Sequence, residues 1–149
     1  MRVFVISVFL FLTGLQAIPS VAAATFTVRH AEGENTVLRA GQSVWLPLQA
    51  DDELQLGDRI FSSEGGVLQI QSSVGILELT DRADLLIRAA GAAEAVGPIT
   101  LELAAGHLKG DWNSDWQRPL TIQVPGGEFS VENGFFSLWI YSLLGKPYT

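Results

Sequence analysis

Apolar and polar residues alternate along most of the chain. The clearest alternating segments are 68–71, 77–80, 99–103, 120–124 and 129–132. Because successive side chains on a strand point to opposite faces, each segment predicts a strand with one buried and one solvated face. Segments 26–30 and 43–46 follow the same pattern. Segment 135–141 is apolar at every position except Ser137, so we expect it to be buried on both faces or covered by the chain end.

Turn-forming residues separate these segments at short intervals. They include Glu64-Gly65-Gly66, Thr80-Asp81, Gly106, Pro125-Gly126-Gly127 and Asn133-Gly134. Glycine adopts positive φ without strain, and Asn and Asp tolerate it, so the chain can reverse at these points. Many short strands with frequent turns predict an all-β domain, either a sandwich, a barrel or a solenoid. The alanine-rich stretch 89–95 is interrupted by Gly91, and we expect a loop or a single turn there.

The N-terminal segment has the pattern of a secretory signal peptide. Arg2 precedes thirteen largely apolar residues, 3–15, which are too few for the roughly 20 residues that span a bilayer. Pro19 ends the apolar stretch, and Ala22 and Ala24 supply the small side chains that signal peptidase requires. We therefore expect residues 1–24 to be removed and 25–149 to form one mature domain. The alternative is an uncleaved anchor.

Composition narrows the classes of function. The chain carries nine Lys and Arg against sixteen Asp and Glu, a net charge of −7, and it has no cysteine. A nucleic-acid-binding protein needs a basic face, and binding to anionic lipid needs one as well, so we expect neither partner. The lack of cysteine excludes disulfides, thiolate nucleophiles and cysteine metal sites. An apolar share of 48% is too high for intrinsic disorder.

Four segments follow one another in a recognisable order: Leu54–Ile60, Glu64–Ile70, Leu101–Leu108, and Ile122–Val131 followed by Asn133–Phe136. Together they resemble the FecR-like domain, an exported β-domain of iron-responsive regulators that also occurs in other envelope proteins. The resemblance covers about residues 44–140. It departs from the family at Val124 and at Asn133-Gly134-Phe135, where the family usually has threonine before the late proline and a Gly-Thr pair. The resemblance implies a short, twisted β-helix or β-solenoid, with a β-sandwich as the alternative, and it implies no catalysis.

The resemblance also limits what is expected of function. Full-length regulators have a cytoplasmic segment that binds a sigma factor, a membrane helix and a C-terminal module that meets an outer-membrane transducer. We expect none of these here, because Met1-Arg2 alone precedes the apolar run and nine residues follow Ile140. What the resemblance leaves is an exported module, periplasmic or secreted, that contacts other molecules of the envelope.

Residues 111–116 are the most conspicuous candidate contact surface. Trp112 and Trp116 could form a platform that stacks on sugar rings, while Asn113 and Asp115 bond the hydroxyl groups. The alternative is a loop whose tryptophans fold over the core. A calcium loop is disfavoured, since Trp116 stands where glycine is needed and Ile122 stands where a bidentate Glu belongs.

The remaining titratable residues are expected to be structural. Asp51, Asp52 and Glu53 are consecutive acids of the kind found on solvated turns, and Asp58 is expected to cap the turn that Gly57 begins. His30 and His107 are the two histidines, and neither lies near a Gly-x-Ser-x-Gly motif. We therefore assign no catalytic residue, no metal ligand and no cofactor.

Three functions follow from these expectations. The first is a non-enzymatic binding, signalling or scaffolding module that contacts an envelope protein. The second is a glycan- or peptidoglycan-binding module that uses Trp112 and Trp116. The third is a small hydrolase, which would need a pocket with two carboxylates roughly 5 to 10 Å apart. In each case the mature protein would not insert into the membrane.

Overall fold

The structure is a computed structural model that describes residues 26–88, 98–113 and 119–141. The predicted leader with Ala22 and Ala24, the alanine-rich stretch, and Asp115 and Trp116 lie outside the described residues. The strands are β1 (Phe26–Glu32), β2 (Asn35–Leu38), β3 (Trp45–Pro47), β4 (Glu53–Leu54), β5 (Arg59–Ser62), β6 (Val67–Gln71), β7 (Gly75–Ile87), β8 (Ile99–Asn113), β9 (Leu120–Val124), β10 (Gly127–Val131) and β11 (Asn133–Ile140). The all-β prediction is confirmed, since the described residues contain strands and no helix.

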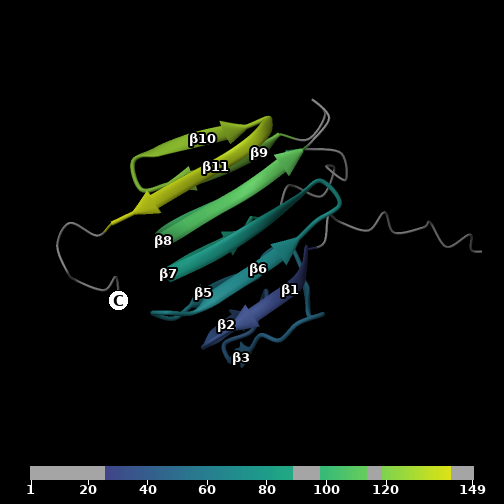
Figure 1. Cartoon of the computed structure of the whole chain (residues 1–149). Coiled ribbons are helices and arrows are strands. Elements are labelled where there is room, and N and C mark those ends of the chain that lie inside the picture. Colours follow the sequence, from purple (N-terminus) through teal and green to yellow (C-terminus); the bar gives the residue numbers. More distant parts are fainter. Residues whose placement is uncertain (1–25, 89–97, 114–118, 142–149) are drawn as a thin grey trace, which may run out of the picture.

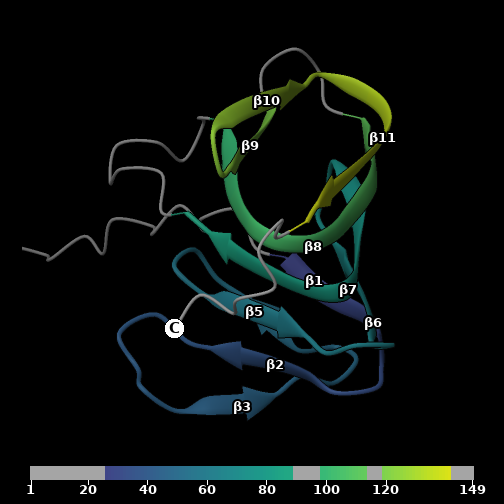
Figure 2. The same ribbon diagram turned by 90° about the vertical axis from the view of Figure 1, so that its left-hand side faces the viewer.

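All eleven strands belong to one sheet, and Figure 1 shows them side by side from β10 to β3. Nine of the ten strand pairs are antiparallel, and among the described residues β8–β9 is the single parallel pair. The curvature therefore comes from bent antiparallel strands, whereas a β-helix would coil through parallel ones. Figure 2 shows the result at one end, where β8 bends into an arc with β9 and β10 on one side and β11 on the other.

The two longest strands divide the sheet into two halves. β7 and β8 pair along their lengths, but each changes its second neighbour midway. The first half of β7 pairs with β6 and its second half pairs with β5, while the start of β8 pairs with β9 and its end with β11. One half of the sheet therefore runs β4-β1-β6-β7-β8-β11, and the other runs β3-β2-β5-β7-β8-β9-β10. Strands that pass between two halves in this way are how β-sandwiches make their corners.

A local bend in β7 and β8 marks the change from one half to the other. Asp81 and Arg82 have positive φ values of 58° and 59°, and the pairing register shifts between Thr80 and Asp84. Gly106 lies opposite this point with φ at +88°, and a Cβ atom there would come within 2.3 Å of the Ala83 Cα. Thr80-Asp81 and Gly106 were predicted as chain reversals, and this prediction is wrong, because both strands continue through the bend. Only glycine allows two backbones to approach so closely at this φ.

One hydrophobic core lies between the two halves. It is built by the inward positions of nearly every strand, among them Phe26, Val28, Val37, Ile60, Leu68, Ile70, Leu77, Leu79, Leu85, Leu101, Leu103, Leu108, Leu120 and Ile122. Each of these side chains alternates with a more exposed neighbour, as the sequence pattern predicts. The core accounts for the stability of a domain that has no disulfide, because buried apolar area is the dominant favourable term in folding.

Trp112 is part of this core, which corrects its prediction as a contact residue. β8 extends to Asn113, so Trp112 has the same parity along the strand as the buried Leu108 and points inward. Gly75 lies opposite it, and a Cβ at Gly75 would come within 2.5 Å of the indole ring. The indole therefore occupies the space that glycine leaves, and its side chain is fully buried.

The turn at Gly57-Asp58 is held by its own aspartate, as predicted. Asp58 is buried, and its carboxylate accepts hydrogen bonds from the backbone N–H groups of Gln55, at 2.9 Å, and Ala40, at 3.1 Å. The Arg39 guanidinium donates to it at 2.7 Å. The carboxylate thus connects the start of β5 to the end of β2 and satisfies three donors at once.

Gly106 and Gly126 make a matched pair for testing the bend. They have similar φ values, +88° and +91°, but a Cβ at Gly126 meets nothing within 4 Å. Gly126→Ala should lower the free energy of unfolding by about 1–2 kcal/mol through backbone strain alone. Gly106→Ala should lower it by at least about 3 kcal/mol, because the added methyl group also collides with a backbone. Urea denaturation followed by tryptophan fluorescence measures both losses, and equal losses would contradict a close contact at Gly106.

Candidate functional site

The outer surface of β7, β8 and β11 carries the densest set of polar and aromatic contacts in the described residues. We call it the outer face. It consists of the outward positions of these three strands, which form three rows across the sheet: Ile76–Asp111–Phe135, Glu78–Lys109–Ser137 and Thr80–His107–Trp139. The inward neighbours of these residues belong to the core, so strand parity alone fixes which side chains reach the outer face.

The middle row contains a charged ladder. The Lys109 ammonium contacts the Glu78 carboxylate with Nζ–Oε1 at 2.7 Å, and the Gln69 amide donates to the other carboxylate oxygen at 2.8 Å. The hydrogen bond from Lys109 lowers the pKa of Glu78 below its ordinary value, burial opposes this, and Gln69 adds to it. Glu78 is therefore an anion at neutral pH with both oxygens occupied, and Ser137 lies directly across from Lys109.

Aromatic side chains line β11 on the same face. Phe135, Trp139 and Tyr141 are 87%, 47% and 72% exposed. Trp139 stacks on the His107 ring with centroids 3.7 Å apart and planes within 7°, and Tyr141 stacks on Trp139 at 5.8 Å. The prediction that segment 135–141 is buried on both faces is therefore wrong, and the alternative, that the chain end covers it, falls on residues outside the described ones. One face of β11 is half-buried against the core, and the other carries an exposed aromatic row.

His107 lies at the centre of a chain of four hydrogen-bonding groups. Its Nε2 is 2.8 Å from the Ser137 Oγ, and its Nδ1 is 3.1 Å from the Thr80 Oγ1. The Thr80 hydroxyl is in turn 3.0 Å from the Asp81 carboxylate, which itself lies 4.0 Å from the His107 Nδ1. The imidazole is only 8% exposed, whereas Ser137 at one end of the chain is open to solvent.

The carboxylate at the far end fixes the direction of these hydrogen bonds. An ionised Asp81 can only accept, so the Thr80 hydroxyl donates its one proton to it. The Thr80 oxygen must then accept from Nδ1–H of His107, which leaves Nε2 without a proton. Nε2 therefore accepts the hydrogen bond of the Ser137 hydroxyl. The network assigns the Nδ1–H tautomer, with the basic nitrogen directed at an exposed serine.

The bend in the sheet brings these four groups together. His107 directly follows Gly106, and Asp81 is one of the two residues with positive φ on the facing strand. In a regular strand, Thr80 and Asp81 would point to opposite faces, and the carboxylate could not reach the Thr80 hydroxyl on the outer face. The same bend that divides the sheet thus places the Asp81 carboxylate on the Nδ1 side of the His107 ring.

A groove of about 630 Å³ runs along the outer face next to Ser137. Its lining residues are Ile76, Glu78, Lys109, Gly110, Asp111, Phe135, Phe136 and Ser137. Ile76 and Phe135 provide apolar walls, and Lys109 and Asp111 provide charges. The groove can therefore hold a small molecule or chain segment that is mainly apolar and has one polar group.

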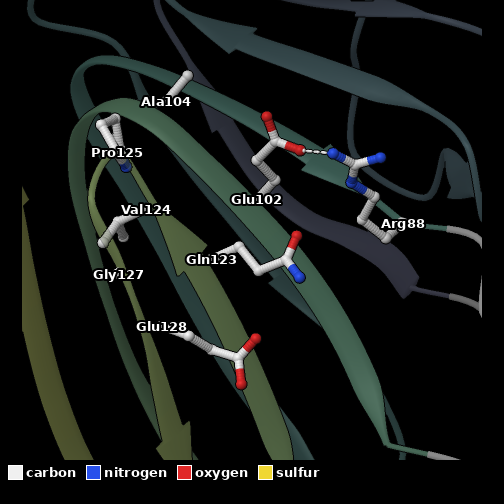
Figure 3. Close-up of a pocket in the computed structure, with 8 residues that line it drawn as sticks. All are labelled: Arg88, Glu102, Ala104, Gln123, Val124, Pro125, Gly127 and Glu128. Atoms are coloured by element: carbon white, nitrogen blue, oxygen red, sulfur yellow. Dashed lines mark hydrogen bonds and ion pairs between the residues drawn. The ribbon is translucent and has the colours of Figure 1, made fainter.

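A second, more polar cleft of about 370 Å³ lies on the other half of the sheet (Figure 3). Glu102, Gln123 and Glu128 form a row across β8, β9 and β10 there, and Arg88 pairs with the Glu102 carboxylate. The hydrolase alternative needs two carboxylates in different surroundings. Here neither glutamate is buried, Gln123 lies between them, and one is already in an ion pair, so this cleft favours polar contact over acid–base chemistry.

The described residues among those singled out from the sequence do not come together in a site. Trp112 is in the core, Asn113 is exposed at the end of β8, and Asp115 and Trp116 lie outside the described residues. The acids at 51–53 lie on a turn in which the Asp52 carboxylate accepts the backbone N–H of Gln49 at 2.8 Å. This fits the expected structural role.

The functional residues that sequence reasoning missed are Thr80, Asp81, Lys109 and Ser137, together with the role of His107. Ser137 could have been found from the sequence, because it is the single polar residue in the apolar segment 135–141. The other four lie 28 to 57 positions away from it, and nothing in the local pattern gives the register that brings them beside it.

Comparison with known proteins gives no match among family models, curated proteins or solved structures. In residues 26–88, 98–113 and 119–141, no helix is long and apolar enough to cross a bilayer. The same residues contain no group of three or more His, Asp or Glu side chains placed to hold a metal ion. The resemblance to the FecR-like domain therefore stays a prediction from the motifs quoted above.

The buried imidazole predicts how stability depends on pH. Burial lowers the pKa of His107 below its ordinary value of 6.5; Asp81 opposes this, Lys109 adds to it, and Glu78 opposes it. In the unfolded chain the imidazole binds its proton near pH 6.5, whereas in the folded protein it binds one only at lower pH. The contribution of His107 to stability is therefore complete above pH 6.5 and is lost as the pH falls through the lower, folded-state pKa.

Two measurements check this prediction. The imidazole resonances of His107 in an NMR titration should shift with a midpoint below 6.5. His107→Gln should reduce the loss of unfolding free energy between pH 7 and pH 5. A His107 midpoint at or above 6.5 would show that the ring is not buried as described.

Proposed function

We propose that this protein is an exported binding module of the cell envelope that acts through protein–protein contact. In this proposal, the free edge of β11 receives an extended segment of the partner, which continues the sheet by one strand. Addition of a strand provides affinity through main-chain hydrogen bonds and specificity through side chains at alternate positions. The outer face beside β11 would supply that specificity.

The observation that carries the proposal is the unprotected edge of β11. The strand has eight residues, and none of them is charged or proline. Its pairing with β8 is continuous and has no bulge, and β8 is its one partner among the described strands. Natural proteins protect edge strands with charges, proline, bulges or short length, because open backbone groups recruit other strands. β11 has none of these protections.

The other edges of the sheet differ from β11 in this respect. β3 has three residues and ends in Pro47, and β4 has two residues. β10 has five residues and includes Glu128. Three edges of the sheet are protected and the longest edge is open. This contrast supports a specific binding role for β11.

The aromatic row beside this edge supports the same proposal. Phe135 and Trp139 lie on the exposed face of β11, and the exposed Tyr141 directly follows the last residue of the strand. Aromatic residues are enriched at protein interfaces because they bury a large area with little loss of side-chain entropy. Stacking on His107 already holds Trp139 in one orientation, so less entropy is lost when a partner binds.

Charge indicates the chemistry of the partner. The chain has a net charge of −7, and removal of the predicted leader makes it −8, because Arg2 is lost. Two copies of the chain would repel one another as they approach. We therefore propose a partner segment that is neutral or basic and carries apolar side chains at alternate positions. The glycan-binding alternative loses one of its two tryptophans, because Trp112 is in the core and Trp116 lies outside the described residues.

A photoreactive side chain at the edge tests this proposal. The probe p-benzoylphenylalanine replaces Phe135, and crosslinking is carried out in the intact envelope of cells that produce the protein. One discrete adduct should form with another envelope protein. Tyr141→Lys, made in the same chain, should reduce its yield at least about tenfold, because a charge at an edge opposes strand addition.

The matched control places the same probe at Phe61, an exposed phenylalanine on the other half of the sheet. No such adduct should form there. Adducts of equal yield from both positions would contradict a specific edge site. An adduct with twice the mass of the chain would identify a second copy as the occupant and would reject the proposed partner.

A further inference from the structure

The outer face places an exposed hydroxyl next to a basic imidazole nitrogen. The Ser137 Oγ lies 2.8 Å from Nε2 of His107, and the network of Thr80 and Asp81 leaves that nitrogen free to take a proton. Serine activated by histidine, with an acid orienting the ring from the other side, is the arrangement that acyl-transfer enzymes use on unrelated folds. Binding of a partner strand would not require this arrangement.

We propose that Ser137 is a nucleophile activated by His107 and that it accepts the acyl group of small carboxylic esters. This inference goes beyond the binding role, and it departs from the sequence-based expectation that the chain has no enzymatic role. The two proposals share the outer face but use different groups. Strand addition uses the backbone edge of β11, whereas acyl transfer uses one hydroxyl and one imidazole.

Ester hydrolysis would proceed through an acyl group carried on Ser137. The Ser137 oxygen attacks the ester carbonyl carbon, and its proton moves to Nε2 of His107. The bond between the carbonyl carbon and the alcohol oxygen then breaks, and the departing oxygen takes the proton from Nε2. Water completes the cycle in the same way: it gives one proton to Nε2, attacks the acyl group, and the Ser137 oxygen leaves with that proton. The products are the acid and the alcohol.

The neighbouring residues have distinct roles in this scheme. Thr80 and Asp81 are positioning residues, because they hold Nδ1–H and so keep Nε2 basic. Lys109 lies directly across from Ser137 and also lines the groove, so its ammonium, which contacts Glu78, is the cation we assign to the negative charge that develops on the carbonyl oxygen. A fixed positive charge at such a point stabilises the transition state.

The groove indicates the class of substrate. Ile76 and Phe135 form apolar walls beside Ser137, and the groove of about 630 Å³ is open to solvent along the sheet. An acyl group that is short, uncharged and apolar fits between these walls.

A fluorophosphonate probe and p-nitrophenyl butyrate test the nucleophile directly on the purified full chain. The probe should label the protein once, and mass spectrometry should locate the label on Ser137. Labelling and the release of p-nitrophenol should both fall at least about tenfold in Ser137→Ala and in His107→Gln, since general-base assistance typically contributes 10²-fold or more. Ser130→Ala is the control, an exposed serine on β10 that should change neither rate.

A second measurement remains informative if the ester reaction is slow. The chain has no cysteine, so Ser137→Cys carries a single thiol. A thiol next to an imidazole is converted to the reactive thiolate more readily than an isolated one. Its reaction with iodoacetamide at pH 7 should exceed that of Ser130→Cys at least about tenfold, and adding His107→Gln should remove the difference.

Thr80→Val, added to Ser137→Cys, tests the positioning role through the pH profile of the thiol reaction. Without the Thr80 oxygen, Nδ1–H of His107 loses its acceptor. The pH at which the rate of the iodoacetamide reaction is half its maximum should therefore shift, whereas loss of a purely structural contact would leave it unchanged. Circular dichroism of each variant checks that the sheet is intact. Labelling of Ser137→Ala at the wild-type rate, a label located elsewhere, or equal reactivity of the two cysteine variants would overturn the proposal.

Discussion

The close contact between Gly106 and Ala83 is the constraint on which the rest of the structure depends. A side chain at Gly106 would overlap the backbone of the facing strand, and its φ of +88° is one that other residues rarely adopt. The positive φ values of Asp81 and Arg82 complete the bend on β7. Because both long strands turn at this point, each can pair with one neighbour before it and another after it, and a single sheet encloses its own core.

The candidate site is a consequence of the same bend. A regular pair of strands would place Asp81 on the inner side, where a carboxylate would be costly to bury without a partner. The irregularity instead turns it toward Thr80 and His107 on the outer face. The fold thus explains why an acid, an imidazole and an exposed hydroxyl from three strands lie in one line, although each belongs to a different part of the sequence.

The sequence predicts the strands better than it predicts their partners. Alternation located β1, β6, β9 and β10 closely, because one buried face leaves a period of two in the sequence. The turn chemistry at Thr80-Asp81 and Gly106 was also detected, but the same residues serve chain reversals and bulges, and local pattern does not distinguish them. Trp112 was assigned to a loop because its strand was predicted to end too early. The site was not predicted because it depends on how three strands pair with one another. The residues that this pairing brings beside Ser137 lie 28 to 57 positions away from it in the sequence.

The most direct test of this account is the distance between the two strands at the bend, measured by NMR. Strong nuclear Overhauser effects are expected between the α-protons of Gly106 and the backbone and methyl protons of Ala83, together with contacts between the rings of His107 and Trp139. A regular ladder of contacts through residues 80–84, with Gly106 at the ordinary spacing of paired strands, would contradict it.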